Sequence, residues 1–460
     1  MLADLLEPAS LKTSKTRPSL SAGVRVIRDK LGQGKNRRSV RRALLVDKAS
    51  GLLHELPTIY ILRKYGQKAL RTQITVLYDL AFYIEWVELK AARNEAARAK
   101  TPAVAVWQRP EARLRAGRPA LSEREITDLS GWCQSTAPDL VRARQRETDN
   151  IRVLASARAV GSGTTNSRLE NISAYLVWLT KEMVEGTLLL EDVAIARSVY
   201  LQESLQEAFT SHMSAENKAA PYRSLDKAHA TAVRQNLAST NFLPNTAAGR
   251  RDRLINRLLL ATGLRAGELL KLQCGDIDDN YVLEGRTVGV IKVIRRPNDP
   301  DDERDIEPAV KSLPGPIIVS RSLASDLIEY TRGDRRAAVD ACTNSRETPY
   351  LFVCDHGKQR GKPISQRNLN RIVAKLNRIP NTSATISPHV LRHTHFTEFA
   401  ETCEKSGRSE KDTKAVIRNR GHWSPNSETP NHYTRRFTEK REAELVEERD
   451  RQLESDQRKI

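Results

Sequence analysis

The chain is poor in cysteine, and the few cysteines it has are not paired. They are scattered singly along 460 residues, with no CxxC pair among them: Cys133, Cys274, Cys342, Cys354 and Cys403. A disulfide framework and a zinc ribbon both require cysteines at short, regular spacings. The sequence therefore excludes both, and we expect reduced, mostly buried thiols.

Segments that would direct the chain to a membrane are also missing. No run approaches the roughly 18 consecutive apolar residues of a membrane span, and no basic amphipathic anchor stands out. The N-terminal stretch "MLADLLEPASLKTSK" lacks the charged start and apolar core of a signal peptide. We expect a cytoplasmic protein without a membrane partner.

Negative charge is scarce relative to positive charge. The chain carries 76 Lys and Arg against 57 Asp and Glu, a formal net charge of +19. Such an excess favours a polyanion as partner. No cluster of Asp and Glu suggests a metal site, so we expect neither a metal nor another cofactor. The length allows two or three domains.

Residues 1–45 are predicted to form a basic N-terminal arm. Residues 1–50 hold 12 Lys and Arg but only 4 Asp and Glu, and "GQGKNRRSVRR" (32–42) combines Gly with a charge run. A flexible arm that lies along DNA and a merely solvated tail both fit this composition.

Residues 46–215 are predicted to be all-helical. Apolar residues in "RTQITVLYDLAFYIEWVE" recur at three- and four-residue steps, and 164–184 is a second amphipathic stretch. Ser122 and Glu125 form a plausible helix cap. Residues 91–120 contain three prolines and are expected to be a connector.

A polar linker at 214–224 separates this region from a domain of different texture. There we expect an α+β domain, helices around a small antiparallel sheet, over 225–440, so that the whole chain is mainly α. The predicted strands are 285–296, 315–320 and 350–354, with a long acidic turn at 296–308. The predicted helices lie around Gly263 (253–272) and at 321–332, 365–378, 389–402 and 411–419.

The stretch "HVLRHTHF" (389–396) places His389 and Arg392 on one helical face, beside the apolar Val390 and Leu391. Alone, this pair is no more than a surface His near a surface Arg. Upstream, Arg265 lies in the apolar context "ATGLRAGELL", where Glu268 could hold it, although a purely structural ion pair would look the same.

Two further boxes follow downstream. "RGHWSP" places His422 between Gly421 and Trp423, and "NHYTRRF" presents Tyr433 among basic residues. Ordinary packing is the alternative for Tyr433, because the chain has eleven tyrosines.

Taken in order, Arg265, His389, Arg392, His422 and Tyr433 resemble the tyrosine recombinase (phage integrase) family. The boxes "TGLRAGE", "HVLRH", "RGHW" and "HYTRR" match that family's order and similar spacing, over about 230–440. More loosely, 46–215 is similar to the family's helical core-binding domain. The resemblance implies a catalytic domain at 225–440, followed by a helical C-terminal tail at 441–460.

The family also uses a lysine on a β-hairpin turn, and two candidates exist. Lys292 lies within "VGVIKVIRR", and Lys311 lies in "PAVKSLPGPIIV" just before the next strand. Similarity to relatives with an acidic insert in this hairpin favours Lys311. The chain departs from the family pattern at Arg420, where Leu usually precedes "GH", and in the eleven-residue step from His422 to Tyr433.

The resemblance implies a chemistry that needs no metal and no ATP. Arg265 and Arg392 would clamp the non-bridging phosphate oxygens, and His389 and His422 would donate to them or accept the tyrosine proton. Tyr433 would attack, and Lys311 would protonate the leaving 5′-oxygen. The product would be a 3′-phosphotyrosine that conserves the bond energy for rejoining.

We therefore expect a site-specific recombinase that cuts and rejoins double-stranded DNA to integrate or excise a mobile element. The resemblance implies four protomers on DNA and leaves open a partner recombinase. A type IB topoisomerase-like enzyme and a non-catalytic DNA-binding accessory protein are the alternatives.

Overall fold

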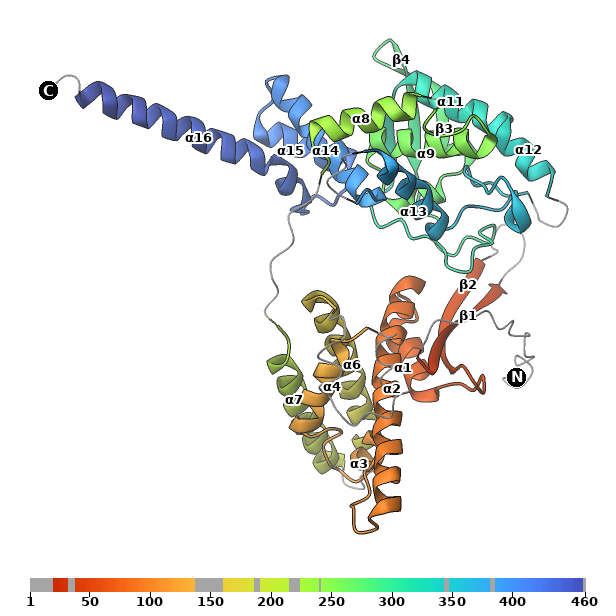
Figure 1. The fold of residues 1–460 in the computed structure, drawn as a ribbon, viewed down its shortest axis with the longest axis vertical. Coiled ribbons are helices and arrows are strands. Elements are labelled where there is room, and N and C mark those ends of the chain that lie inside the picture. The colour runs from red at the N-terminus through yellow and green to blue at the C-terminus, as the bar shows by residue number, and fades with distance from the viewer. Residues whose placement is uncertain are drawn as a thin grey trace. The chain divides into compact units, whose positions relative to one another are not determined.

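The computed structural model describes residues 20–31, 38–136, 160–185, 191–214, 224–239, 241–342, 347–380 and 385–457. The chain divides into two compact units, 1–31 with 40–219 and 32–39 with 220–460 (Figure 1). The predicted linker falls at this division, but its residues 215–223 lie outside the described residues, as do 1–19. None of the described helices is both long and apolar enough to span a bilayer.

The N-terminal unit combines a two-stranded sheet with a helical core. Its elements are β1 (Ala22–Leu31), β2 (Arg38–Asp47), α1 (Glu55–Tyr65), α2 (Leu70–Lys100), α3 (Pro110–Arg115), α4 (Glu123–Cys133), α6 (Ser162–Glu185) and α7 (Glu191–Ser211). Buried aromatic rings from α1, α2 and α6 meet at its centre, with Tyr83 and Tyr175 5.9 Å apart. The capping box of Ser122 and Glu125 is confirmed.

The expectation of a flexible arm up to residue 45 is wrong for its described part, because residues 22–31 and 38–45 lie in strands. Ala43 and Leu45, on either side of the half-buried Leu44, are fully buried, and their backbone N–H groups donate to Gln73 and Thr58. The charge count obscured this two-residue period. The connector is also shorter than expected, because α2 continues to Lys100.

The C-terminal unit is the predicted α+β assembly, and the mainly α fold class is confirmed. Its elements are α8 (Lys227–Ala238), α9 (Ala247–Thr262), α10 (Ala266–Lys271), β3 (Ile277–Leu283), β4 (Arg286–Val293), β5 (Gly315–Val319), α11 (Arg321–Arg332), α12 (Asp334–Asp340), α13 (Gln366–Ala374), α14 (Pro388–Lys405), α15 (Glu410–Arg420) and α16 (Thr429–Gln457). Short 3₁₀ turns occupy Cys274–Asp276, Gly357–Gln359 and Lys375–Arg378.

The three-stranded antiparallel sheet has the order β3-β4-β5. Ile291 and Ile317 face each other in the register and are buried in the core beneath α11. Two expectations need correction: β3 was not predicted, and 350–354 forms isolated bridges instead of a strand. The acidic turn predicted at 296–308 folds inward, and its Asp302 is fully buried.

Helix α14 is braced against α9 and α15 by a buried histidine. The Nδ1–H of His395 donates to the carbonyl of Leu260 at 2.8 Å, and Nε2 accepts from Arg420 Nε at 2.9 Å. Arg420 also donates to the carbonyls of Ala261 and Ile318. Because an arginine can only donate, Nε2 of His395 must be unprotonated. Burial and the Arg420 charge lower the pKa of His395 to about 3.

This depressed pKa makes the brace sensitive to acid. Between pH 6.5 and about 3, His395 is protonated in the unfolded chain but neutral in the folded protein. The free energy of unfolding therefore falls as pH falls. The contribution reaches about 1.4 kcal/mol per pH unit. Urea unfolding should show the stability gap between wild type and His395→Gln narrowing from pH 7 to pH 5. A stability gap that stays constant from pH 7 to pH 5 would contradict this assignment.

Candidate active site

The first box is a turn that only glycine permits. Gly263 ends α9 in the left-handed conformation with φ of 64°, and an added Cβ would lie 2.6 Å from the ring of His395. The chain then enters α10, with Arg265 as the residue before its first turn. This reversal places the Arg265 guanidinium at the edge of the unit, with 29% of its side chain exposed.

The second box lies on α14, where Arg392 is buried. Its guanidinium donates to the carbonyl of Gly263 at 2.5 Å and to that of Gly421 at 3.4 Å. It also lies over the rings of Phe396 and Trp423, 4.7 and 4.9 Å from their centroids. These contacts tie α14 to the first and third boxes and fix one orientation of the guanidinium.

One carboxylate joins the two arginines. Glu268, 3% exposed, accepts from Arg265 NH1 at 3.0 Å and from the Arg265 backbone N–H at 2.8 Å. Arg392 NH1 lies 3.9 Å from Oε2 of Glu268, the oxygen that accepts from the Arg265 backbone. The hydroxyl of Ser312 donates to Oε1 of Glu268 at 2.5 Å. The Arg265–Glu268 pair considered from sequence is therefore present, and it extends to Arg392.

The third box turns sharply after α15. Gly421 packs so closely on Trp423 that an added Cβ would lie 2.3 Å from the indole ring. His422 follows with φ of 51°, in the left-handed region that is strained for a non-glycine residue. Its Nε2 lies 3.3 Å from the carbonyl of Pro316, and its own carbonyl accepts from Leu313. The turn thus holds His422 against the start of β5.

Tyr433 occupies the first turns of α16 and is 6% exposed. Its ring packs on Trp423 and Phe396, at 5.9 and 5.3 Å between centroids. Its hydroxyl lies 2.8 Å from Nδ1 of His393, whose Nε2 lies 2.8 Å from Nε2 of His389. The predicted nucleophile therefore lies at one end of a chain of two imidazoles.

Burial, and after it the positive charge of the site, keeps these imidazoles neutral. Burial, followed by the neighbouring His389 and Arg392, lowers the pKa of His393 to about 3. Burial and the charges of Arg392 and Arg265 lower the pKa of His389 as well. Burial and the Arg265 charge lower the pKa of Arg392 to about 10, so it stays protonated at neutral pH. The arrangement is a cationic site that would gain from a bound anion.

The two lysine candidates differ in what their neighbours contact. Lys292 is exposed on β4, opposite Pro316 in the sheet register. Lys311 is exposed in the segment that leads into β5. Its neighbour Ser312 donates to Glu268, and Leu313 donates to the carbonyl of His422. The backbone beside Lys311 is therefore tied to the first and third boxes.

The structure brings together five of the six predicted site residues: Arg265, His389, Arg392, His422 and Tyr433. Lys311 stands in the adjoining segment without a described side-chain partner in the site. Sequence reasoning left His393 out, although its position four residues after His389 predicted a shared helical face. Ser312 gave no signal in the sequence, and Trp423 was noted only as the residue that follows His422. Among the described residues, no three His, Cys, Asp or Glu side chains come together as a metal site.

No protein-family model matches the chain. Curated relatives match about a third of it. It is 27% identical over 153 residues to tyrosine recombinase XerD of Staphylococcus haemolyticus (strain JCSC1435), covering 33% of this chain and 42% of the relative. It is 26% identical over 158 residues to tyrosine recombinase XerC of Bacillus pumilus (strain SAFR-032), covering 34% of this chain and 42% of that relative. The chain thus spans less than half the length of these relatives.

Solved structures show weaker likeness. The crystal structure of XerA recombinase matches with a TM-score of 0.31 at 13% identity, covering 83% of this chain and 92% of that one. The post-cleavage complex of XerH bound to palindromic difH substrate matches with a TM-score of 0.37 at 15% identity. The match covers 73% of this chain and 94% of that one. At these TM-scores the likeness adds nothing to the assignment. In sequence, about a third of the chain is similar to tyrosine recombinases, and its four boxes resemble those of that family.

Proposed function

We propose that this protein is a site-specific DNA recombinase that cuts and rejoins duplex DNA through a 3′-phosphotyrosine intermediate. One observation carries the proposal. The Tyr433 hydroxyl, two neutral imidazoles and two arginines that share one carboxylate lie in a single cluster. Attack on a phosphodiester requires a nucleophile with a proton acceptor, beside fixed positive charge.

The two arginines would stabilise the charge that develops on the phosphate. Glu268 neutralises only part of their combined charge, so a pentavalent phosphate would meet guanidiniums already in place. Arg265 is partly exposed and could approach one non-bridging oxygen from solvent. Arg392 is held rigidly by its carbonyl and ring contacts. Such preorganised charge is worth most in the transition state, where the negative charge is greatest.

His393 would take the proton of Tyr433. When the hydroxyl donates to Nδ1, neutral His393 carries its own proton on Nε2 and donates it to His389. As the tyrosine oxygen attacks phosphorus, its proton moves to Nδ1, and the Nε2 proton can pass to His389. This assigns to His393 the acceptor role that the family resemblance suggested for His389 or His422.

Lys311 would protonate the 5′-oxygen that leaves when the strand is cut. The bond from phosphorus to the 5′-oxygen breaks, and the Lys311 ammonium donates a proton to that oxygen. Reversal, with a 5′-hydroxyl attacking the phosphotyrosine, rejoins the strand without ATP. No bond energy is lost, because one phosphodiester replaces another.

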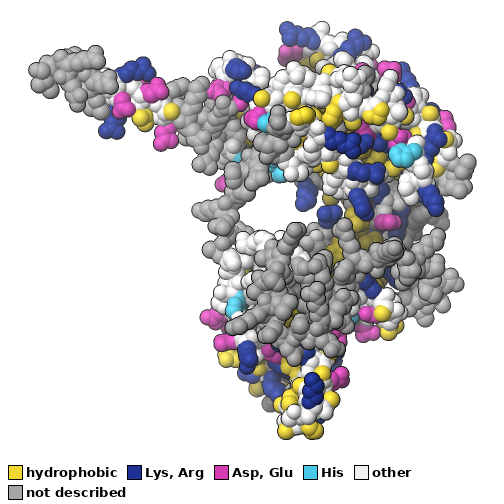
Figure 2. Space-filling model, viewed as in Figure 1, with side chains coloured by type: hydrophobic (Ala, Val, Ile, Leu, Met, Phe, Trp, Pro, Cys, Tyr) yellow, Lys and Arg dark blue, Asp and Glu magenta, His cyan; other side chains and the backbone are white. Residues whose placement is uncertain are grey.

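Double-stranded DNA is the proposed substrate. Figure 2 shows Lys and Arg side chains gathered on the visible face of the C-terminal unit. Lys358 and Arg360, which precede α13, and Arg367 and Arg371 within it are exposed. The family resemblance adds a tetrameric assembly on DNA in the cytoplasm and a role in integrating or excising a mobile element. A type IB topoisomerase-like enzyme would relax supercoils without bringing two sites together.

The nucleophile can be tested with nicked duplexes tiled across the DNA that flanks the coding sequence. A nick traps the covalent adduct because the cut fragment diffuses away. Wild type should form an adduct that survives denaturing electrophoresis. Tyr433→Phe should bind the same DNA and form none, since it lacks only the attacking oxygen. An adduct that persists in the variant and maps to another tyrosine would disprove the assignment.

The leaving-group role of Lys311 can be separated from that of Lys292 with a 5′-bridging sulfur at the cleavage position. The thiolate is a good leaving group and needs no general acid. Lys311→Ala should cleave all-oxygen DNA slowly and sulfur DNA at the wild-type rate. Arg265→Ala should be slow on both, because it lacks charge stabilisation. If the sulfur rescues Lys292→Ala instead of Lys311→Ala, the role belongs to Lys292.

The C-terminal tail is predicted to dock on a neighbouring protomer. Helix α16 runs without a break from Thr429 to Gln457, so Tyr433 and the tail share one helix. Leu445 and Val446 are 62% and 53% exposed within the protomer. Deleting 445–460 should leave single-site binding unchanged, weaken assembly of two sites measured by gel shift, and change the cleavage rate. A truncated protein that assembles and recombines like the full chain would show that the tail is only a solvated helix.

A further inference from the structure

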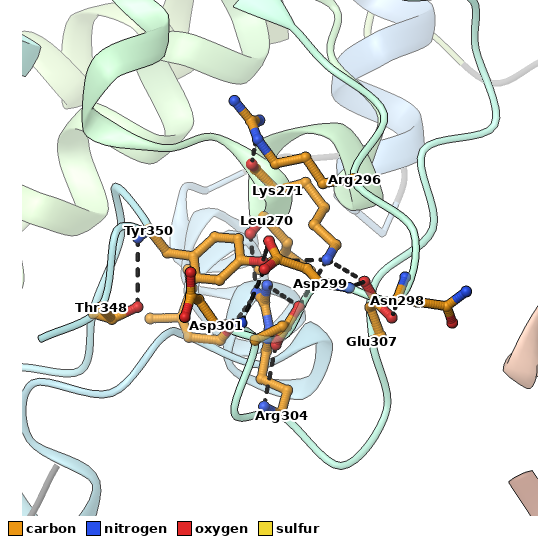
Figure 3. Close-up of polar contacts among 12 residues, drawn as sticks. Leu270, Lys271, Arg296, Asn298, Asp299, Asp301, Arg304, Glu307, Thr348 and Tyr350 are labelled. Atoms are coloured by element: carbon orange, nitrogen blue, oxygen red, sulfur yellow. Dashed lines mark hydrogen bonds and ion pairs between the residues drawn. The ribbon is translucent and has the colours of Figure 1, made fainter. Parts of the chain in front are cut away.

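The connection from β4 to β5 contains a buried polar cluster. This connection comprises residues 294–314. Lys311 lies near its end, four residues before β5 begins. Its acidic part, 296–308, folds inward onto the end of α10 (Figure 3). We call the buried polar groups there the insert cluster: Lys271, Asp299, Asp302, Arg304, Glu307 and Tyr350.

Lys271, from the last turn of α10, is the central cation of the insert cluster. It is 2% exposed, and its ammonium lies 2.5 Å from Glu307 and 3.0 Å from Asp302. The hydroxyl of Tyr350 lies 3.2 Å from the same ammonium and donates to Asp299 at 2.5 Å. Three acidic residues of the insert are thus tied directly or through Tyr350 to one helix terminus.

Arg304 adds a second set of bonds. Its guanidinium makes two bonds of 2.8 Å to Asp302 and donates to the carbonyls of Leu270 and Ile364 at 2.9 and 3.1 Å. Burial would raise the pKa of Asp302, but Arg304 and Lys271 lower it to about 2. Asp302 is therefore ionised at neutral pH, held between two buried cations. Breaking one member would leave another buried without its partner.

The same connection is bonded to the active site at its far end. Arg295 donates to the carbonyls of Ser312 and Lys311, at 2.7 and 3.2 Å. Gly267 lies so close to the carbonyl of Ala309 that an added Cβ would be 2.1 Å from it. Ser312 then bonds to Glu268. Helix α10 thus carries the Arg265–Glu268 pair at its start and the insert cluster at its end.

We propose that the insert cluster positions Lys311 for proton donation, so that the leaving-group side of the site is assembled before DNA binds. This rests on the proposed function, in which Lys311 protonates the 5′-oxygen. Seventeen residues separate Val293 from Lys311. A free loop of that length would have to be ordered at each encounter with DNA. Anchoring it to α10 fixes Lys311 relative to the same helix that presents Arg265.

Two variants weaken the insert cluster while leaving other contacts in place. Arg304→Met removes the bonds to Asp302 and two carbonyls but leaves Asp302 paired with Lys271. Glu307→Gln keeps the side-chain shape and removes one charge. Each should slow adduct formation on all-oxygen DNA by about 10- to 100-fold, since a ~1 Å misplacement of a reacting group costs about that much. A 5′-bridging sulfur, which needs no acid, should restore the rate.

Arg251→Met is the matched control. Arg251 is also a buried arginine of this unit, and its bonds go to Asp252, Val353 and Asp355. Any decrease that it causes in the rate of adduct formation should be equal on all-oxygen DNA and on 5′-bridging-sulfur DNA. The positioning proposal is overturned if Arg304→Met and Glu307→Gln behave like this control, or if neither slows cleavage.

Hydrogen exchange gives a readout that does not depend on activity. The N–H of Leu313, bonded to the carbonyl of His422 at 2.9 Å, reports on the order of the connection. Its exchange in the DNA-free protein should be faster in Arg304→Met than in Arg251→Met. If wild type forms no adduct on any DNA, the proposed function fails. In that case, unchanged exchange at Leu313 would independently refute the positioning role.

Discussion

The site depends on one buried carboxylate, that of Glu268. It is 3% exposed and is surrounded by Arg265, Arg392 and the hydroxyl of Ser312. Two guanidiniums brought this close would repel each other, and Arg265 already lowers the pKa of Arg392. The carboxylate offsets part of that repulsion without cancelling it. What remains is a net positive, preorganised site with a structural reason to bind a phosphate.

The surrounding fold consists of short, rigid connections that converge on this carboxylate. The left-handed turn at Gly263 aims Arg265, and the tight turn at Gly421 aims His422. Helix α14 supplies Arg392 on one face, while His395 braces its other side. The insert cluster secures the end of α10 opposite Glu268. Each element fixes a side chain of the site that would otherwise lose rotamer freedom on binding the proposed substrate.

Sequence reasoning predicted the features that depend on local spacing. Most helices of the C-terminal unit, though not α8 or α12, strands β4 and β5, and the four boxes follow from periodicity and motif order. It failed where partners lie far apart in the chain. The acidic insert has the composition of a solvated turn, but its charges pair with Lys271 and bond to Tyr350. His393 gained significance only beside Tyr433, forty residues later. Strand β2 was hidden because Arg38, Arg41 and Arg42 in its first half gave it the composition of a solvated arm.

The central claim is that Glu268 holds both arginines for one phosphate, and adduct formation by Glu268→Gln tests it most directly. The amide keeps the shape of the side chain but loses the charge that places Arg265 and Arg392. With DNA saturating, the account predicts slower adduct formation on all-oxygen and 5′-bridging-sulfur DNA by the same large factor, because charge stabilisation fails on both. A wild-type rate, or a defect that sulfur repairs, would contradict it.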